Sequence, residues 1–260
     1  MRYLLLFLIT CASRPESGSE IRRIVSLAPS LTEIVFFLDG GDRLVGVTTF
    51  CDYPEQAKSI YKVGDFSNPS LERIIALKPD LILATMPEQR RIIIELMKMD
   101  IPVFTSHPRT LVDIISEIDS IAHLLKVRSP RDSLLDLIQS SPVKERPRVY
   151  LELSPDPIIT IGSSSYLNDL IKKSGGENIF SDLNLEFPSV NWADVLRRDP
   201  EIILIFHTQD YRGRIGWKGL SAVRSGMVID DLNPDIYLRP GPRTFQAYSE
   251  LKEIISRCGE

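Results

Sequence analysis

The sequence is poor in the residues on which most catalytic and metal centres depend, with only 3 cysteines and 3 histidines among 260 residues. His107, His123 and His207 are far apart and none has a partner at metal-ligand spacing, so no metal site is expected. Gly162 is followed by three serines and does not form a Gly-x-Ser-x-Gly nucleophile elbow. Residues 28–30, after the first expected strand, lack the glycines of a dinucleotide-binding loop. We therefore predict no catalytic residue, no cofactor and no enzymatic activity.

Charge of one sign is not concentrated in any segment. The net charge is -4, and acidic and basic residues are interleaved, which excludes the basic face of a nucleic-acid-binding protein. The apolar run at residues 3–9 is too short to span a bilayer. It follows Arg2 and precedes Cys11, as in an export signal of the bacterial lipoprotein type, with residues 12–20 as a polar tether. The alternative is a start codon placed upstream of a soluble protein.

These N-terminal features predict an exported protein whose lipidated Cys11 anchors it in the periplasm or on the outer face of the cytoplasmic membrane. Two thiols, Cys51 and Cys258, then remain. They could form a disulfide in an oxidising compartment or be two unrelated thiols, and the sequence leaves both alternatives open.

One helix-to-strand unit occurs twice in the chain. Residues 71–84 and 193–206 each read as a short helix, a proline, an acidic residue and a continuously apolar strand. Pro79 and Pro200 end their helices, and the residue before each proline is expected to be extended. Apolar runs of this kind are typical of parallel strands that are covered on both faces. Two copies of one unit predict two similar lobes.

Strands and helices alternate through the rest of the chain, which predicts an α/β fold with parallel central sheets. A helix at residues 31–38 is expected to begin with Ser30 as its N-cap and Glu33 completing a capping box. Residues 167–180 resemble this helix and the Gly40–Gly41 pair that ends it. The chain therefore contains a second repeated segment, and the two repeats occur in the same order in both halves. Further strands are expected at residues 24–27, 43–48, 103–104, 149–153, 158–161 and 227–229, and further helices at 92–98, 131–139 and 243–255.

Apolar residues of segment 111–125 recur at helical spacing without an internal glycine or proline. We expect one stiff helix here that joins two Rossmann-like lobes and permits only a small hinge change. The expected organisation is a signal at 1–11, a tether at 12–20, an N-terminal lobe at 21–106, a connecting region at 107–147 and a C-terminal lobe at 148–260.

Aromatic residues fall in or beside the expected strand-to-helix turns of both lobes. As a group they suit the walls of a cleft for a large, flat, partly apolar ligand, although any one of them is more often part of a core. The aromatic candidates are Phe50, Tyr53, Phe66, Phe180, Phe187 and Tyr237. Arg239 lies in a rigid Arg-Pro-Gly-Pro-Arg loop and His207 ends a buried strand, so both are further ligand-binding candidates. Alternatively, Arg239 forms an ion pair that caps the last helix, and His207 is a histidine packed in the structure.

Five segments together resemble the substrate-binding proteins of ABC importers, in the group that binds cobalamin, ferric siderophores and haem. The segments are residues 23–33, 51–54, 71–81, 175–180 and 239–243. The resemblance covers nearly the whole mature chain and is closest to cobalamin-binding members. It implies a non-enzymatic monomer that captures a corrinoid between its lobes and delivers it to a membrane permease and its ATPase.

The resemblance also assigns roles to single residues. Phe50 and Phe180 match aromatic contacts of the corrin, Arg239 matches an arginine that reaches the ligand, and Phe66 and Phe187 stand where cobalamin binders have tryptophan. Thr85 also replaces a tryptophan, so a ferric siderophore or haem remains the alternative ligand, and a chelatase-like enzyme the alternative class.

Two acidic residues, one in each lobe, would pair with arginines of the permease. Glu72 matches the first of them, while the second falls on Ala193, with Asp194 beside it.

Overall fold

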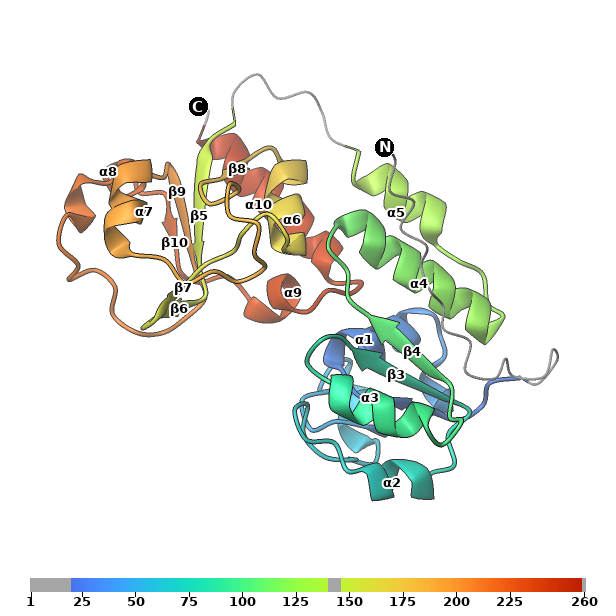
Figure 1. Ribbon diagram of the computed structural model, residues 1–260. Coiled ribbons are helices and arrows are strands. Elements are labelled where there is room, and N and C mark those ends of the chain that lie inside the picture. The colour runs from blue at the N-terminus through green and yellow to red at the C-terminus, as the bar shows by residue number, and fades with distance from the viewer. Residues whose placement is uncertain (1–19, 140–145, 259–260) are drawn as a thin grey trace, which may run out of the picture. The chain divides into compact units, whose positions relative to one another are not determined.

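The computed structural model describes residues 20–139 and 146–258 (Figure 1). They form two compact units, here called the first lobe and the second lobe. The first lobe contains the described residues up to His107 together with Ile121–Arg128, and the second contains Pro108–Ser120 and the described residues from Ser129 onward. The expected export signal, Cys11, the tether up to residue 19 and residues 140–145 of the connecting region lie outside the described residues.

A four-stranded parallel sheet in the order β2-β1-β3-β4 forms the centre of the first lobe. Its strands are β1 (Ile24–Ser26), β2 (Leu44–Val47), β3 (Leu81–Thr85) and β4 (Val103–Ser106). Its helices are α1 (Pro29–Phe37), α2 (Leu71–Ala76) and α3 (Arg90–Met97), with one-turn 3-10 helices at Gly41–Arg43 and Glu55–Ser59. All three sheet pairings are parallel, as the apolar strand pattern predicted.

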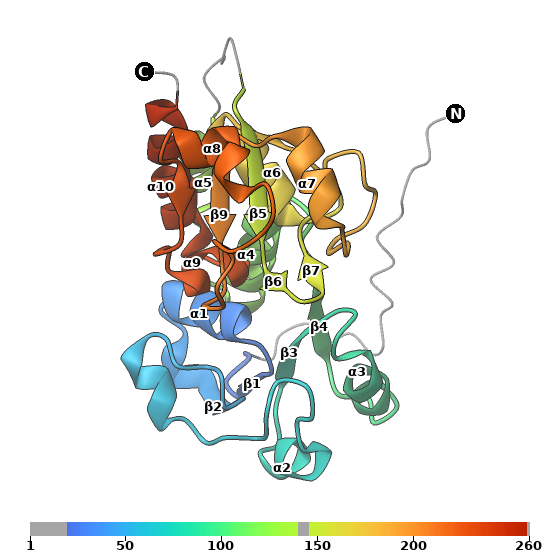
Figure 2. The same ribbon diagram turned by 90° about the vertical axis from the view of Figure 1, so that its left-hand side faces the viewer.

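Apolar residues of α2 and α3 cover one face of this sheet. Ile74 of α2 and Leu96 of α3 are fully buried against Val25 of β1 and Ile82 of β3. Figure 2 shows α2 and α3 beside the strands that they cover. The sheet is therefore buried, as a parallel sheet should be.

The second lobe repeats this plan with the parallel order β10-β9-β5-β8. The strands are β5 (Arg148–Glu152), β8 (Glu177–Asn178), β9 (Ile202–Ile205) and β10 (Val228–Ile229), and β6 (Ser154–Pro155) and β7 (Ile158–Ile159) form a separate antiparallel pair. The helices are α5 (Arg131–Leu137), α6 (Tyr166–Ser174), α7 (Trp192–Arg198), α8 (Ser221–Arg224), α9 (Pro234–Leu238) and α10 (Thr244–Arg257), with a 3-10 turn at Trp217–Gly219. In Figure 1, α6 and α10 lie on one side of the sheet, and α7 and α8 lie on the other.

The repeated unit is confirmed, and the acidic residue after each proline has the same task in both copies. In the first lobe, the carboxylate of Asp80 accepts hydrogen bonds from the backbone N–H groups of Arg22 and Arg23, each at 2.9 Å. In the second lobe, Glu201 accepts one from the N–H of Arg148, also at 2.9 Å. Each acid thus fastens its own strand to the beginning of the neighbouring central strand.

Three local expectations were wrong. Helix α1 begins at Pro29 with Ala28 as its N-cap, because a proline in the first turn already has helical φ and needs no side-chain cap. The expected capping box of Ser30 and Glu33 is absent, and both residues lie inside the helix. The residues before the two prolines, Lys78 and Asp199, adopt left-handed φ values of 47° and 42° and not extended geometry.

The third difference concerns the expected strand at residues 158–161, of which only Ile158–Ile159 is a strand. The next residues bond elsewhere, since the N–H of Thr160 donates to Pro188 O and the N–H of Gly162 donates to Glu186 O. This segment is therefore tied to a loop and does not join the parallel sheet.

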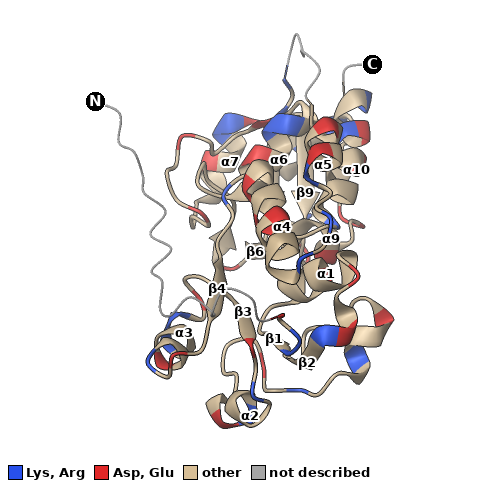
Figure 3. Cartoon of the chain, turned by 90° about the vertical axis from the view of Figure 1, so that its right-hand side faces the viewer, with Lys and Arg blue, Asp and Glu red and all other residues tan. Residues whose placement is uncertain are grey.

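The long amphipathic helix is confirmed as α4 (Leu111–Leu125), a continuous helix of 15 residues. The boundary between the two units falls within it, because residues up to Ser120 group with the second lobe and Ile121 onward with the first. Among the described residues, no helix is long and apolar enough to cross a membrane. Figure 3 shows basic and acidic residues mixed on α3 and on α10. Cys51 and Cys258 are both free thiols.

We expect Gly162→Ala to destabilise the second lobe. A Cβ atom at this position would lie 2.3 Å from Leu185 O and 2.4 Å from Leu183 O, and these are backbone atoms that cannot move independently. The free energy of unfolding should fall by about 1–3 kcal/mol, as for other overpacked sites, in urea denaturation. Gly213→Ala is the matched control, because no atom lies within 4 Å of its added Cβ. Equal stability of the two variants would contradict this account.

Candidate functional site

The candidate residues gather at the carboxyl ends of the parallel strands, where open α/β sheets bind their ligands. In the first lobe, Phe50 follows β2 and is 59% exposed, and Tyr53 in the same loop is 45% exposed. Phe66 is half-buried. The first lobe thus presents aromatic surface at the edge where the sequence predicts ligand contacts.

A buried glutamine, Gln89, holds the Phe66 loop at this edge. Its Nε2 donates to Leu27 O, just after β1, and to Phe66 O, both at 2.8 Å. Its Oε1 accepts a 3.0 Å hydrogen bond from the N–H of Thr85, the last residue of β3. Because one amide satisfies three backbone groups, the position of Phe66 relative to the sheet is fixed by Gln89.

In the second lobe, Phe187 is 46% exposed and lies in a segment bonded to the end of the β6–β7 region. The N–H of Thr160 donates to Pro188 O at 3.0 Å, and the hydroxyl of Thr160 donates to Leu151 O of β5 at 2.6 Å. The segment that carries Phe187 is therefore linked through Thr160 to the central strand β5, and its role as a ligand contact stays a prediction.

Phe180 and Tyr237, by contrast, are buried. The ring of Phe180 packs against Tyr150 with 6.0 Å between centroids, and Arg198 lies 4.6 Å from the centroid of the Phe180 ring. The rings of Tyr237 and Phe206 are in contact, with 5.2 Å between their centroids. Both rings lie beneath the surface of the second lobe, and their role as direct ligand contacts stays a prediction.

Arg239 follows α9 and its guanidinium pairs with Asp235 at 3.0 Å, one helical turn away. Arg243 reaches the same carboxylate at 4.0 Å. The Arg239 side chain is 17% exposed, so it is mostly buried and already has an ionic partner.

The most concentrated polar cluster of the second lobe surrounds Glu152, the last residue of β5. Its side chain has no exposed surface. Arg214 bonds both carboxylate oxygens, at 2.7 Å each, the hydroxyl of Tyr150 donates to Oε2 at 2.6 Å, and His207 Nε2 lies 2.8 Å from Oε1. Each carboxylate oxygen therefore has two partners, which accounts for all its usual acceptor sites.

Burial alone would raise the pKa of Glu152, because it disfavours the charged form. The hydrogen bonds from Arg214, Tyr150 and His207 outweigh burial and lower the pKa of Glu152 below its ordinary value of 4.5. Burial, together with the adjacent Glu152 charge, raises the pKa of Tyr150. The cluster is thus an ionised Glu152–Arg214 pair with a neutral Tyr150 at neutral pH.

Residues 207–217 follow β9, and three contacts of their side chains hold this segment in place. The guanidinium of Arg214 lies 4.8 Å from the centroid of the Trp192 ring, and Trp192 stacks on Trp217. Tyr211 is buried and its hydroxyl donates to Asp230 at 2.5 Å. Burial, followed by the hydrogen bond to Asp230, raises the pKa of Tyr211 to about 12.

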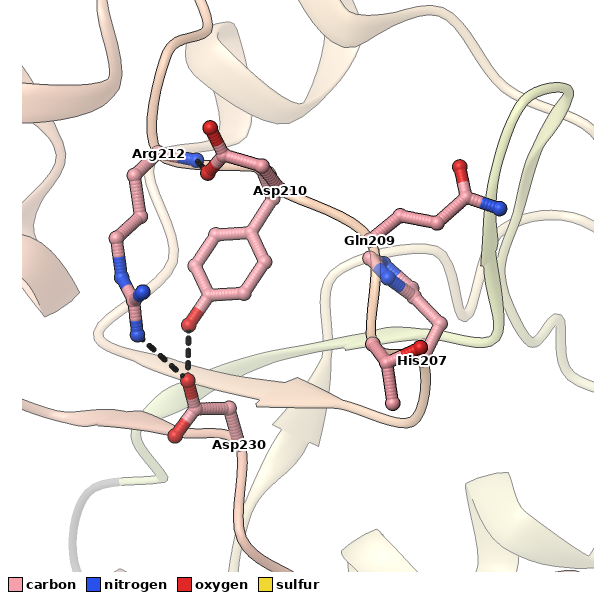
Figure 4. Close-up of a pocket in the computed structure, with 7 residues that line it drawn as sticks. His207, Gln209, Asp210, Arg212 and Asp230 are labelled. Carbon is pink, nitrogen blue, oxygen red and sulfur yellow. Dashed lines mark hydrogen bonds and ion pairs between the residues drawn. The ribbon is translucent and has the colours of Figure 1, made fainter.

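A polar cavity of about 260 Å³ borders this loop (Figure 4). It is lined by His207, Thr208, Gln209, Asp210, Tyr211, Arg212 and Asp230. His207, predicted as a ligand contact, therefore lies at the wall of a cavity and also belongs to the buried Glu152 cluster. The other predicted contacts do not line this cavity.

The two predicted docking residues occupy equivalent helix starts but differ in their partners. Glu72 is exposed in the first turn of α2. Asp194 in the first turn of α7 forms an ion pair with Arg197 at 2.6 Å. Their docking roles stay predictions.

Among residues 20–139 and 146–258, no group of three or more His, Cys, Asp or Glu side chains is arranged to hold a metal ion. Sequence reasoning missed Gln89, Glu152 and Arg214. One signal was available for Glu152, since a glutamate that ends a buried strand is almost never fully buried without a partner. The partner Arg214 lies 62 residues away, and nothing local indicates it.

Comparison with known proteins confirms the resemblance. The vitamin B12-binding protein of Vibrio parahaemolyticus serotype O3:K6 (strain RIMD 2210633) is 32% identical over 265 residues, which cover 96% of this chain and 94% of that protein. The crystal structure of the periplasmic vitamin B12-binding protein BtuF of Vibrio cholerae superposes with a TM-score of 0.79 at 30% identity, covering 92% of this chain and 98% of that one.

A possible iron-binding periplasmic solute-binding protein from Staphylococcus epidermidis ATCC 12228 has a TM-score of 0.74 at 26% identity, covering 91% and 99% of the two chains. A family model described as "Periplasmic binding protein" matches residues 24–233. With most of its length matched in sequence and in fold, this chain belongs to the periplasmic binding protein family.

Proposed function

We propose that this protein is the substrate-binding component of an ABC importer, that it binds a corrinoid, cobalamin, at the carboxyl edges of its two sheets, and that it delivers the ligand to a membrane permease. The observation that carries the proposal is its similarity over 96% of the chain to a vitamin B12-binding protein. The exposed rings of Phe50 and Phe187 support it, since large flat ligands are held by aromatic faces.

Charge at the second lobe's carboxyl edge favours a corrinoid over an anionic iron chelate. Arg214 is paired with Glu152, Arg239 with Asp235 and Arg212 with Asp230. Because Arg214 and Arg212 each have a carboxylate partner, these two arginines offer little net attraction to an anion, whereas Asp235 is shared by Arg239 and Arg243. The periphery of cobalamin is made largely of neutral amides, which paired side chains can still bind through hydrogen bonds.

The alternative ligand is a ferric siderophore or haem. It is favoured by the phenylalanines and Thr85 at positions where the corrinoid pocket has tryptophan, and by the similarity to the possible iron-binding protein. The second alternative is an enzyme that acts on a metal chelate. Such an enzyme would convert its ligand into a product, whereas a binding protein leaves the ligand unchanged.

The proposal includes export and a lipid anchor at Cys11, which would keep the protein beside its permease. Labelling with a radioactive fatty acid tests the anchor, because Cys11→Ala should abolish incorporation while leaving ligand binding unchanged.

We expect the purified protein to bind cyanocobalamin with a dissociation constant below about 1 μM, and haemin and ferric siderophores more weakly. Calorimetric titration with each ligand measures this, and the absorption spectrum after prolonged incubation reports any chemical change of the ligand. Absence of cyanocobalamin binding at micromolar concentration would reject the corrinoid proposal. An altered spectrum with turnover would support the enzyme.

We expect Glu72→Lys to leave the affinity for cyanocobalamin unchanged and to abolish corrinoid uptake by cells that depend on this protein. The reason is that Glu72 is exposed and would meet positive charge on the permease, so reversing its sign turns attraction into repulsion.

Glu55→Lys is the matched control, because Glu55 is also an exposed acid of the first lobe. Its reversal should not alter uptake. An equal loss of uptake in both variants, or a loss of ligand affinity in Glu72→Lys, would remove Glu72 from the docking surface.

A further inference from the structure

The carboxyl ends of the two central strands differ in one respect, although the lobes share a plan. Strand β1 pairs with β3 as β5 pairs with β9, and in these registers Leu27 of the first lobe corresponds to Glu152 of the second. Leu27 is a buried apolar residue. A buried charge therefore occurs at this position in the second lobe, where the first lobe has a hydrocarbon side chain.

Glu152 fastens both ends of one loop. His207 begins the loop after β9 and Arg214 lies seven residues later, and both bond the same carboxylate. Residues 208–210 between them are exposed, so little apolar packing holds them. The course of residues 207–214 thus depends on a polar contact with Glu152 at each end and, between them, on the buried ring of Tyr211 and the bonds of Tyr211 and Arg212 to Asp230.

The two ions of the cluster depend on each other. A carboxylate without any exposed surface would be strongly disfavoured alone, and the Arg214 side chain is only 16% exposed. Removing either charge leaves the other buried without its ionic partner, and movement of the loop toward solvent would relieve this cost. Tyr150 and His207 cannot replace Arg214, because neither carries its permanent charge.

We infer that Glu152 is a positioning residue for ligand binding, which acts by holding the 207–214 loop and its His207 at the carboxyl edge of the second lobe. The inference rests on the proposed function and adds to it a residue that need not touch the ligand. When the loop is already held in place, ligand binding does not have to order it. The entropy cost of binding is then smaller and the affinity is higher.

Acid should release the loop. The groups that face Glu152 are Tyr150 on its own strand, His207 after β9 and Arg214 in the loop. They lower the pKa of Glu152 below 4.5, so its stabilising effect is complete above that pH and is lost as the pH falls through the lowered value. Binding by the wild-type protein should weaken in the same range.

The test compares Glu152→Gln with Glu201→Gln in the full chain. Glu201 is the matched control, because its carboxylate bonds Arg148 at the opposite end of β5. We expect Glu152→Gln to raise the dissociation constant of cyanocobalamin roughly tenfold at neutral pH and to accelerate hydrogen exchange at residues 208–213. Glu201→Gln should lower the melting temperature without either effect.

The pH dependence of the dissociation constant distinguishes a positioning role of Glu152 from a general loss of protein stability. The dissociation constants of wild type and Glu152→Gln should converge only as the pH falls through the lowered pKa of Glu152, because both proteins then lack the charge. Affinities are compared only where far-ultraviolet circular dichroism shows that each protein is folded.

Arg214→Lys provides a second variant if Glu152→Gln does not fold, because it keeps the charge and removes the two-point contact. It should also weaken binding and accelerate exchange in the loop. If a folded variant at either position binds cyanocobalamin as tightly as wild type, or if Glu201→Gln weakens binding equally, the inference is wrong. If wild type itself does not bind cyanocobalamin, the proposed function fails first and the inference with it.

Discussion

Both lobes depend on a carboxylate at the amino edge of the sheet. Asp80 and Glu201 each follow the proline that ends a helix, and each accepts hydrogen bonds from backbone N–H groups at the start of the neighbouring central strand. This contact joins the starts of β1 and β3 in the first lobe, and of β5 and β9 in the second. The register along the whole length of each strand pair decides which side chains meet at the carboxyl edge.

At the carboxyl edge the lobes use different means to hold their loops. Gln89 in the first lobe is a neutral amide that bonds three backbone groups around Phe66. Glu152 in the second lobe is an ion that needs Arg214 to remain buried. A neutral tie is insensitive to pH, whereas an ionic one is lost when its carboxylate is protonated. The carboxyl-edge loops of the two lobes are therefore expected to differ in how they respond to acid.

The proposed corrinoid ligand suits this combination of surfaces. Exposed rings such as Phe50 and Phe187 offer flat apolar contact. Arg214 and Arg212 near the second edge are each paired with a carboxylate, so these two arginines do not create a strong field for anions. Family membership places the protein among periplasmic binding proteins.

The sequence by itself determined the α/β class, the repeated helix-proline-acid-strand unit and the long helix α4, because apolar periodicity and proline act over a few residues. The family was indicated by the resemblance of five segments to known substrate-binding proteins. The sequence predicted Phe66 and Phe187 as ligand contacts, but it did not predict the hydrogen bonds of Gln89 and Thr160 that hold their loops. Cap and turn details such as the start of α1 were decided by backbone geometry that several residue types can satisfy. Only the tertiary structure brought Glu152 to Arg214 and Gln89 to Phe66, since partners 62 and 23 residues apart leave no periodic trace in the chain.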